Sequence, residues 1–258
     1  MKIPLYETRV QWALAVFLAL IAGYLDGYGL LILGTYVSFM SGNTTTAGLR
    51  SGQDNIHAAL PSAIAIVSFV TGSFLGTLFG QSRARHSHRL IFGAIAILLA
   101  TVAGLELHGL RNAYAEIAML SLAMGMMNPA LSKVGAESVS LTFVTGTLNR
   151  IGGHLAAAAG RIPLPDSQCP GDSHLARARI ETSVWAGFVV GAGLSGMAGS
   201  HFRLWAALLP PIVVMIALGL FSKCAAPSTE KRITPSISRG VQGSVARWIE
   251  DSSARIEL

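Results

Sequence analysis

The segment QWALAVFLALIAGYLDGYGLLILGT, residues 11–35, has a single charged residue, Asp26, among apolar and small side chains. About 20 apolar residues in a helix suffice to cross the ~30 Å hydrocarbon core of a bilayer. Five more apolar segments follow it, at 59–80, 89–108, 113–131, 181–199 and 202–222. Since a helix satisfies its own backbone hydrogen bonds in lipid, this repetition predicts an all-α integral membrane protein with the lipid bilayer as its solvent.

The overall composition supports lipid as the solvent. Of the 258 residues, 52% are hydrophobic and 12% are charged, against about 25% charged in an ordinary soluble domain. The net charge of +6 would raise the question of nucleic acid in a soluble protein. Here the basic residues lie between the apolar segments, so membrane topology explains them and no nucleic-acid partner is predicted.

Two semi-polar segments, 36–50 and 139–160, lie between the apolar ones and are predicted to be interrupted or half-helices. The prediction is therefore six transmembrane helices plus two half-helices in one domain, 1–222. The polar residues 223–258 contain no run able to form a core and are predicted to be a disordered cytoplasmic tail. Residues 1–23 resemble a signal peptide, but apolar character resumes past Asp26, which favours an uncleaved first span.

Basic residues predict the orientation of these helices. Lys and Arg are frequent in the second loop, the fourth loop and the tail, and scarce in the other loops. Because cytoplasmic loops carry the excess of positive charge, both termini are expected on the cytoplasmic side of a bacterial inner membrane.

An internal repeat is the most informative feature of the sequence. FMSGNTTTAGLR (39–50) aligns with FVTGTLNRIGGH (143–154) at an offset of 104 residues. Just upstream, AGYLDGY (22–28) aligns with MGMMNPA (124–130), so that Asp26 matches Asn128. The same patterns in the same order predict a duplication with halves at about 11–108 and 113–222.

Glycine rows extend the repeat at an offset of 119 residues. The two rows are Ser68, Gly72, Gly76 and Gly80, and Gly187, Gly191, Ser195 and Gly199. Such rows allow close helix packing in any membrane bundle, and alone they indicate neighbours rather than chemistry. Together with the other patterns they favour duplication. Three spans per half is an odd number, so the halves are expected to be inverted, as in many secondary transporters.

Asp26 has two interpretations. It lies about 15 residues into the first span, roughly 22 Å along a helix, where a charged acid costs about 2.5 to 3.5 kcal/mol. The first interpretation is a proton or cation coupling site. The second is a buried structural acid bonded to backbone amides or to Tyr24 and Tyr28.

Polar residues at the starts of the two half-helices are candidates to line a solute site, because free N–H groups at helix starts attract anions. With Asp26 and Asn128, the candidate binding residues are Ser41, Asn43, Thr44, Thr145, Thr147, Asn149, Arg150 and His154. Arg150 and His154 are four residues apart on one helix face, which favours a polar or anionic solute. Alternatively, the hydroxyls and amides only repair interrupted backbone hydrogen bonds.

Other polar residues indicate no further chemistry. Glu106, His108, Arg111 and Glu116 are predicted to form a solvated outer charge cluster. The two cysteines are not paired with His or carboxylates at metal-ligand spacing, so no metal, cofactor or disulfide framework is predicted. No G-x-S-x-G or H-E-x-x-H motif occurs, and an enzyme is not predicted.

The stretches AGYLDGYGLL (22–31), YVSFMSGNTTTAGL (36–49) and LTFVTGTLNRIGGHLA (141–156) resemble the YoaK-type family of multi-pass bacterial membrane proteins, a domain of unknown function. The resemblance extends to about residue 222. It implies a helical inner-membrane protein and no established substrate.

Two functions are left open by the sequence. The inverted halves and polar interruptions favour a small-solute secondary transporter or permease. The glycine rows alone are equally typical of a non-transporting membrane scaffold or assembly protein whose helices pack against partners.

Overall fold

The computed structural model describes residues 5–81, 87–130, 133–134, 137–138, 144–164, 172–201 and 204–221. These residues belong to one compact unit, Met1–Cys224. The predicted disordered tail, 223–258, lies outside the described residues.

The first span is a long helix that ends in a wider turn. Helix α1 (Leu5–Tyr28) continues into a π-helical turn, η1 (Gly29–Leu33), and stops at Gly34, whose φ of 65° is left-handed. Glycine adopts this conformation without strain, so it terminates the helix at the end predicted from the apolar pattern. A short irregular stretch then leads into helix α2 (Met40–Gly52), in the region predicted to be a half-helix.

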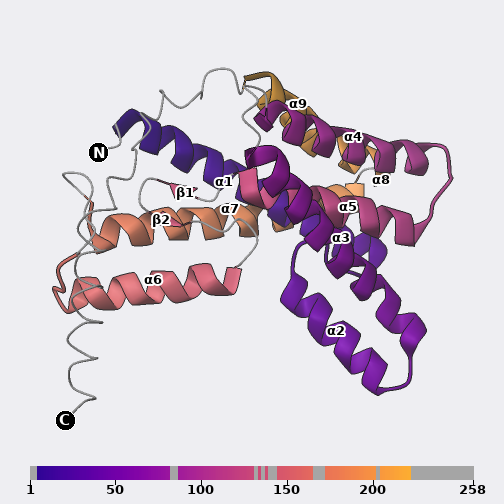
Figure 1. Cartoon of the computed structure of the whole chain (residues 1–258), viewed down its shortest axis with the longest axis horizontal. Helices are drawn as coiled ribbons and strands as arrows, with labels where there is room; N and C mark the ends of the chain where they lie inside the picture. The colour runs from indigo at the N-terminus through magenta and orange to yellow at the C-terminus, as the bar shows by residue number, and fades with distance from the viewer. Residues whose placement is uncertain are drawn as a thin grey trace, which may run out of the picture. The chain divides into compact units, whose positions relative to one another are not determined.

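The described remainder of the domain is also mainly helical, and Figure 1 labels its elements. In chain order they are α3 (Ile56–Gln81), α4 (Ser87–Leu107), α5 (Ala113–Met127), the 3₁₀ turn η2 (Asn128–Ala130), β1 (Lys133–Val134), β2 (Glu137–Ser138), α6 (Val144–Ala159), α7 (His174–His201), α8 (Leu204–Ala207) and α9 (Leu209–Phe221). The two strands form a minimal antiparallel pair that the all-α prediction did not include.

Three of the described helices are long and apolar enough to cross a membrane, at Arg9–Leu33, Ile56–Gly80 and Arg89–Leu107. Two shorter apolar helices cover Ala113–Met127 and Leu209–Leu220. The chain is therefore a helical membrane protein. The count of six crossings stays a prediction.

The outer face of α3 explains how lipid replaces water around this bundle. Val67, Val70, Phe74 and Leu78 recur on one side of the helix and are each more than half exposed. A row of large apolar side chains open to the surroundings is unfavourable in water and favourable against acyl chains.

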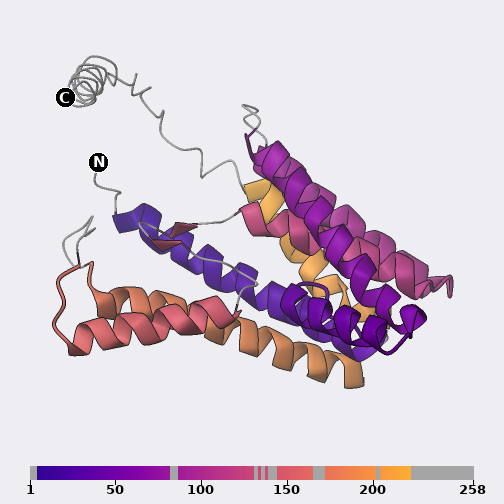
Figure 2. The same cartoon turned by 60° about the horizontal axis from the view of Figure 1, so that its bottom comes forward.

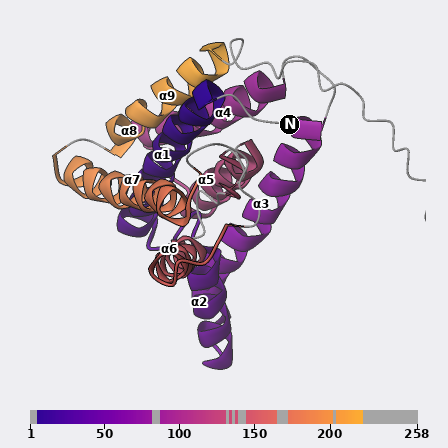
Figure 3. The ribbon, with the colours of Figure 1, turned by 90° about the vertical axis from the view of Figure 1, so that its left-hand side faces the viewer.

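The two most extensive helix pairs, and the α4–α9 pair, join helices that are not consecutive in the chain. Helix α1 packs along α7, α3 along α5, and α4 along α9. The two half-helix regions each pack on the long helix that follows them, α2 on α3 and α6 on α7. Figure 2 shows α6 beside α7, and Figure 3 shows α9 beside α4. The buried core contains side chains of α1, α4 and α5, such as Leu25, Leu99 and Met124.

The α1–α7 pair is in backbone contact at two glycines. A Cβ atom added to Gly23 would overlap the carbonyl oxygen of Phe188, and one added to Gly191 would overlap that of Leu20. Because the obstacle is backbone, relief requires the helices to move apart.

The α3–α5 pair has the same kind of contact. A Cβ atom on Gly72 would overlap the carbonyl oxygen of Leu122, and one on Gly125 would overlap that of Phe69. In both pairs, glycine allows the helix axes to approach closely, and small residues serve this purpose in membrane bundles.

The predicted packing rows do not contact other helices over their full length. An added Cβ on Gly76 would come to 2.7 Å from Met126 O, and one on Gly187 to 2.8 Å from Val16 O. At the ends of the rows, however, Gly80 faces open space and Gly199 would touch only the end of the Leu31 side chain, at 3.8 Å. Crossing helices diverge away from their contact point, which limits each row to about two turns.

Candidate functional site

Asp26 is buried and holds the chain where it turns from the first span into α2. Its Oδ1 accepts hydrogen bonds from the backbone N–H of Val37 at 2.9 Å and of Ser38 at 2.8 Å. These amides precede the first turn of α2 and belong to no regular element. These contacts are the ones expected if Asp26 is a buried structural acid bonded to backbone amides. The other interpretation, a proton or cation coupling site, stays a prediction.

The polar residues of α2 bond mainly to nearby carbonyl groups. The buried Asn43 donates from Nδ2 to Tyr36 O at 2.7 Å. Thr44 is exposed, and its hydroxyl donates to Met40 O at 2.7 Å. Ser41 is also exposed. Asn43 therefore repairs the interruption before α2, while Ser41 and Thr44 lie on an accessible face.

The corresponding residues of α6 also include one buried side chain and two exposed ones. Thr147 is buried, whereas Thr145 and Asn149 are exposed. Asn128, predicted to match Asp26, is half-buried at the junction of α5 and η2, where its backbone N–H bonds to Met124 O.

Arg150 makes a buried ion pair that the sequence did not indicate. Its Nε donates to Glu181 Oε1 at 2.8 Å and its Nη2 to Oε2 at 3.3 Å, and the Glu181 side chain is completely buried. The pair joins α6 to α7. Since its charge is balanced by Glu181, Arg150 lends less support to an anionic solute than the sequence suggested.

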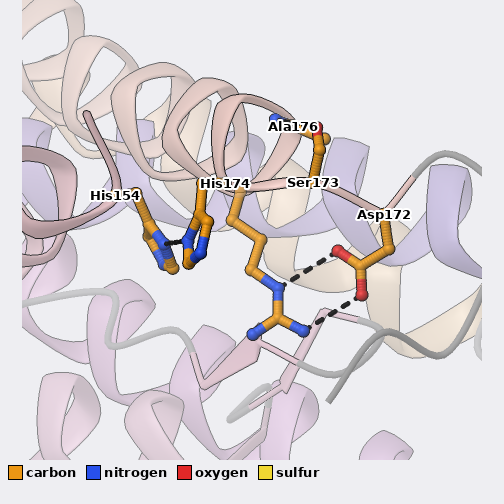
Figure 4. Close-up of polar contacts among 6 residues, drawn as sticks. His154, Asp172, Ser173, His174 and Ala176 are labelled. Carbon is orange, nitrogen blue, oxygen red and sulfur yellow. Dashed lines mark hydrogen bonds and ion pairs between the residues drawn. The ribbon is translucent and has the colours of Figure 1, made fainter. Parts of the chain in front are cut away.

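His154 pairs with a second histidine across the same two helices. Its Nδ1 lies 3.0 Å from Nδ1 of His174, the first residue of α7, and Figure 4 shows the two rings facing each other. One ring must donate and the other accept, so the contact requires at least one neutral imidazole.

The start of α7 is fixed by capping contacts beside these histidines. Ser173 accepts a hydrogen bond from Ala176 N at 3.2 Å, as an N-cap serine does. Asp172 accepts from Arg177 Nε at 3.1 Å and from Nη2 at 3.0 Å. These contacts fix the first turn of α7, from which His174 projects toward His154 of α6.

The two half-helix regions pack against different helices, α2 against α3 and α6 against α7. Figure 1 shows α2 and α6 each beginning at its inner end and running outward, toward opposite ends of the domain. The structure groups Asp26 with the start of α2 and groups Arg150 and His154 with α7.

The charge cluster predicted from the sequence forms in part, since Arg111 contacts both Glu106 and Glu116, but the predicted solvation of the two acids is wrong. The Glu106 and Glu116 side chains are only 4% and 0% exposed, so they are not part of a solvated outer cluster. Of the two carboxylates' partners, Arg111 alone is substantially exposed, at 43%. A signal existed, because Glu116 lies inside the apolar segment 113–131 and not in the loop before it.

Among the described residues, no three His, Cys, Asp or Glu side chains come together as a metal ion would require. The polar groups that the structure gathers are ion pairs, a histidine pair, the Glu106–Arg111–Glu116 group and backbone caps.

Comparisons with known proteins agree with this picture of a membrane bundle. The chain is 31% identical over 148 residues to the UPF0700 transmembrane protein RA0705 of Rhizobium meliloti, covering 57% of the chain and 62% of that protein. It is 29% identical over 137 residues to the UPF0700 transmembrane protein YoaK of Bacillus subtilis, covering 51% and 61% respectively. The chain thus spans about three fifths of the length of these relatives.

No solved structure matches the chain. A family described as protein of unknown function (DUF1275) matches residues 14–221, which include every described helix after the start of α1. The resemblance seen in the stretches around Asp26, Asn43 and Thr147 is thereby confirmed: the chain belongs to the DUF1275 family, and the two relatives above are transmembrane proteins.

Proposed function

We propose that this chain is a secondary transporter for a small polar or anionic solute, built from two inverted halves of three crossings each. The bilayer is the bacterial inner membrane, and both termini are cytoplasmic. The six crossings are α1, α3 and α4 in the first half, and α5, α7 and the α8–α9 segment in the second.

The observation that carries the proposal is the pattern of helix pairs. When α1 is exchanged with α5, α3 with α7, and α4 with α9, the α1–α7 pair becomes the α5–α3 pair and the α4–α9 pair maps onto itself. When α2 is also exchanged with α6, the α2–α3 pair becomes the α6–α7 pair. These repeated pairs are those expected of an internal repeat, whereas the α4–α5 pair has no counterpart of similar extent between α9 and α1.

The glycine contacts support the exchange at single residues. An offset of 102 relates Gly23 to Gly125 and Leu20 to Leu122. An offset of 119 relates Gly72 to Gly191 and Phe69 to Phe188. The contact of Gly23 with Phe188 O therefore corresponds to that of Gly125 with Phe69 O, and the contact of Gly191 with Leu20 O to that of Gly72 with Leu122 O.

The correspondence between the two halves supports transport, because an odd number of crossings in each half makes the second half run through the membrane in the opposite direction. Inverted repeats with interrupted helices are a recurrent design of secondary transporters, with the solute bound where the halves meet. The inner ends of α2 and α6 are the helix N-termini, whose free N–H groups favour a polar or anionic group. Ser41, Thr44, Thr145 and Asn149 supply accessible hydroxyls and amide groups there.

A flux assay on the full chain in proteoliposomes tests the proposal. The probes are phosphate, sulfate, acetate, succinate and alanine, each measured as counterflow against protein-free liposomes. Transport predicts uptake of at least one probe. Absence of flux for every solute tried, together with a stoichiometric partner protein recovered from native membranes, would instead favour the scaffold function.

Thr44 offers a matched test of the site once a solute is found. Thr44→Val is expected to reduce flux about three- to tenfold, the effect of losing one hydrogen bond to the solute. Thr71→Val is the control, because Thr71 is also exposed on a helix and donates to the carbonyl four residues earlier, Val67 O, at 2.8 Å. Equal flux in both variants and wild type would exclude Thr44 from the solute path.

A further inference from the structure

The ends of α4 and α5 bring two buried carboxylates together. Glu106 is in the last turn of α4 and Glu116 in the first turn of α5, and Figure 1 shows the turn that joins these helices. Gly109, with a φ of 69°, and the N-cap Asn112, which accepts from Ala115 N at 3.2 Å, shape that turn. Its geometry places the two acids close enough to interact electrostatically.

The partners of Glu106 and Glu116 are unequal. Glu106 Oε1 lies 3.1 Å from Arg111 Nε and 3.5 Å from the Tyr28 hydroxyl at the end of α1. Glu116 Oε2 lies 3.8 Å from Arg111 Nη2, which is too long for a hydrogen bond. Both Glu116 oxygens are buried, no donor among the described residues bonds to them, and the Glu106 carboxyl group lies beside them.

The charges of this carboxylate cluster, defined as Tyr28, Glu106, Arg111 and Glu116, do not balance. Two carboxylates face one guanidinium, which leaves one negative charge in a buried place. Of the other elements packed on α5, the described part of α3 carries one titratable side chain, the exposed His57, and η1 and η2 carry none. Helix α4 carries Arg89 at its opposite end, and the turn itself carries the exposed His108. A buried, unpaired carboxylate is strongly unfavourable.

We propose that the carboxylate cluster binds one exchangeable monovalent cation, a proton or a sodium ion, between Glu106 and Glu116. Carboxylate and hydroxyl oxygens are ligands suited to a hard cation. One positive charge neutralises the cluster, whereas a divalent ion would leave an excess positive charge buried. Asp26 needs no such ion to satisfy it, because two backbone amides already donate to it.

Cation binding by the carboxylate cluster does not require that the protein is a transporter. A role of this cation as the coupling ion does rest on the proposed function. If the protein is a transporter, the cation binds in the α4–α5 turn, near one surface of the membrane, and binds and leaves during the transport cycle.

Thermal unfolding of the purified full chain in detergent tests the binding. The Tm is measured with sodium chloride or N-methyl-D-glucamine chloride at equal ionic strength, between about pH 6 and pH 9. If the ion is sodium, sodium raises the wild-type Tm by about 3 °C or more at alkaline pH. If the ion is a proton, the folded chain binds more protons than the unfolded chain, and the Tm falls by a similar amount as the pH rises, with or without sodium.

Glu116→Gln removes the excess charge and keeps the shape of the side chain. This variant is expected to lose the sodium or pH response and to match or exceed the wild-type Tm in sodium-free alkaline buffer. Glu106→Gln changes the net charge equally and serves as a second variant should the first fail to fold. Asp54→Asn, which removes an exposed carboxylate outside the carboxylate cluster, should respond as wild type does.

A wild-type Tm that responds to neither cation, or an unchanged response in both glutamine variants, would overturn the proposal. No flux is measured in this experiment, so its outcome is separate from that of the transport assay. A cation-dependent Tm with flux that ignores both sodium and protons would keep the binding site and remove its coupling role.

Discussion

Replacing Gly191 with alanine is expected to destabilise the protein by about 3 kcal/mol or more, the upper range for overpacking a filled contact. The added methyl group would overlap the carbonyl oxygen of Leu20 in the backbone of α1. Backbone cannot change rotamer, so α1 and α7 must separate along their shared length. The expected result is a large loss of Tm or of monodisperse protein in detergent gel filtration.

Gly193 provides the control for this substitution on the same helix. An alanine there meets no atom within 4 Å, and exchanging glycine for alanine in a helix favours folding by up to about 1 kcal/mol. Gly193→Ala should therefore be as stable as wild type or more so. Similar behaviour of the Gly191 and Gly193 variants would show that α1 and α7 are not in backbone contact at this point.

Arg150→Met is the second substitution with a large expected effect, a loss of about 3 to 5 kcal/mol of stability. It removes two charge-assisted hydrogen bonds from the completely buried Glu181 carboxylate. Glu181→Leu is expected to cost less, because Arg150 is partly exposed and its charge can reach solvent or lipid headgroups.

A double-mutant cycle measures the coupling between these two residues. The Arg150→Met, Glu181→Leu double variant should be more stable than Arg150→Met alone, since no buried charge is left behind. Arg50→Met is the control, because the Arg50 side chain is exposed and donates to the exposed Gln53 at 3.3 Å; its effect should stay within about 0.5 kcal/mol. Additive effects in the cycle would contradict the ion pair.

The membrane class and most helix positions could be predicted from apolar runs, because a span must satisfy a fixed length in lipid. The end of the first span at Gly34 and the separate helix from Met40 also follow from local sequence. These features depend on residues that are neighbours in the chain.

The polar contacts between distant parts of the chain could not be predicted, because they depend on which helices become neighbours in space. Glu116 looked solvated because it is close to a loop, yet the ends of α4 and α5 bury it. Arg150 and Glu181 are 31 residues apart, and only the α6–α7 hairpin brings them together. Gly80 has the same spacing as Gly72 but lies beyond the crossing point, which the row alone cannot locate.

The orientation of the two halves is tested most directly by labelling the loops that follow α2 and α6. Single cysteines are introduced at Gln53 and at Ile162, both exposed, in a background with Cys169 and Cys224 replaced by serine. Inverted halves predict that a membrane-impermeant maleimide labels position 53 in intact cells and position 162 only after the membrane is opened. Labelling of both positions from the same side would contradict the inverted arrangement.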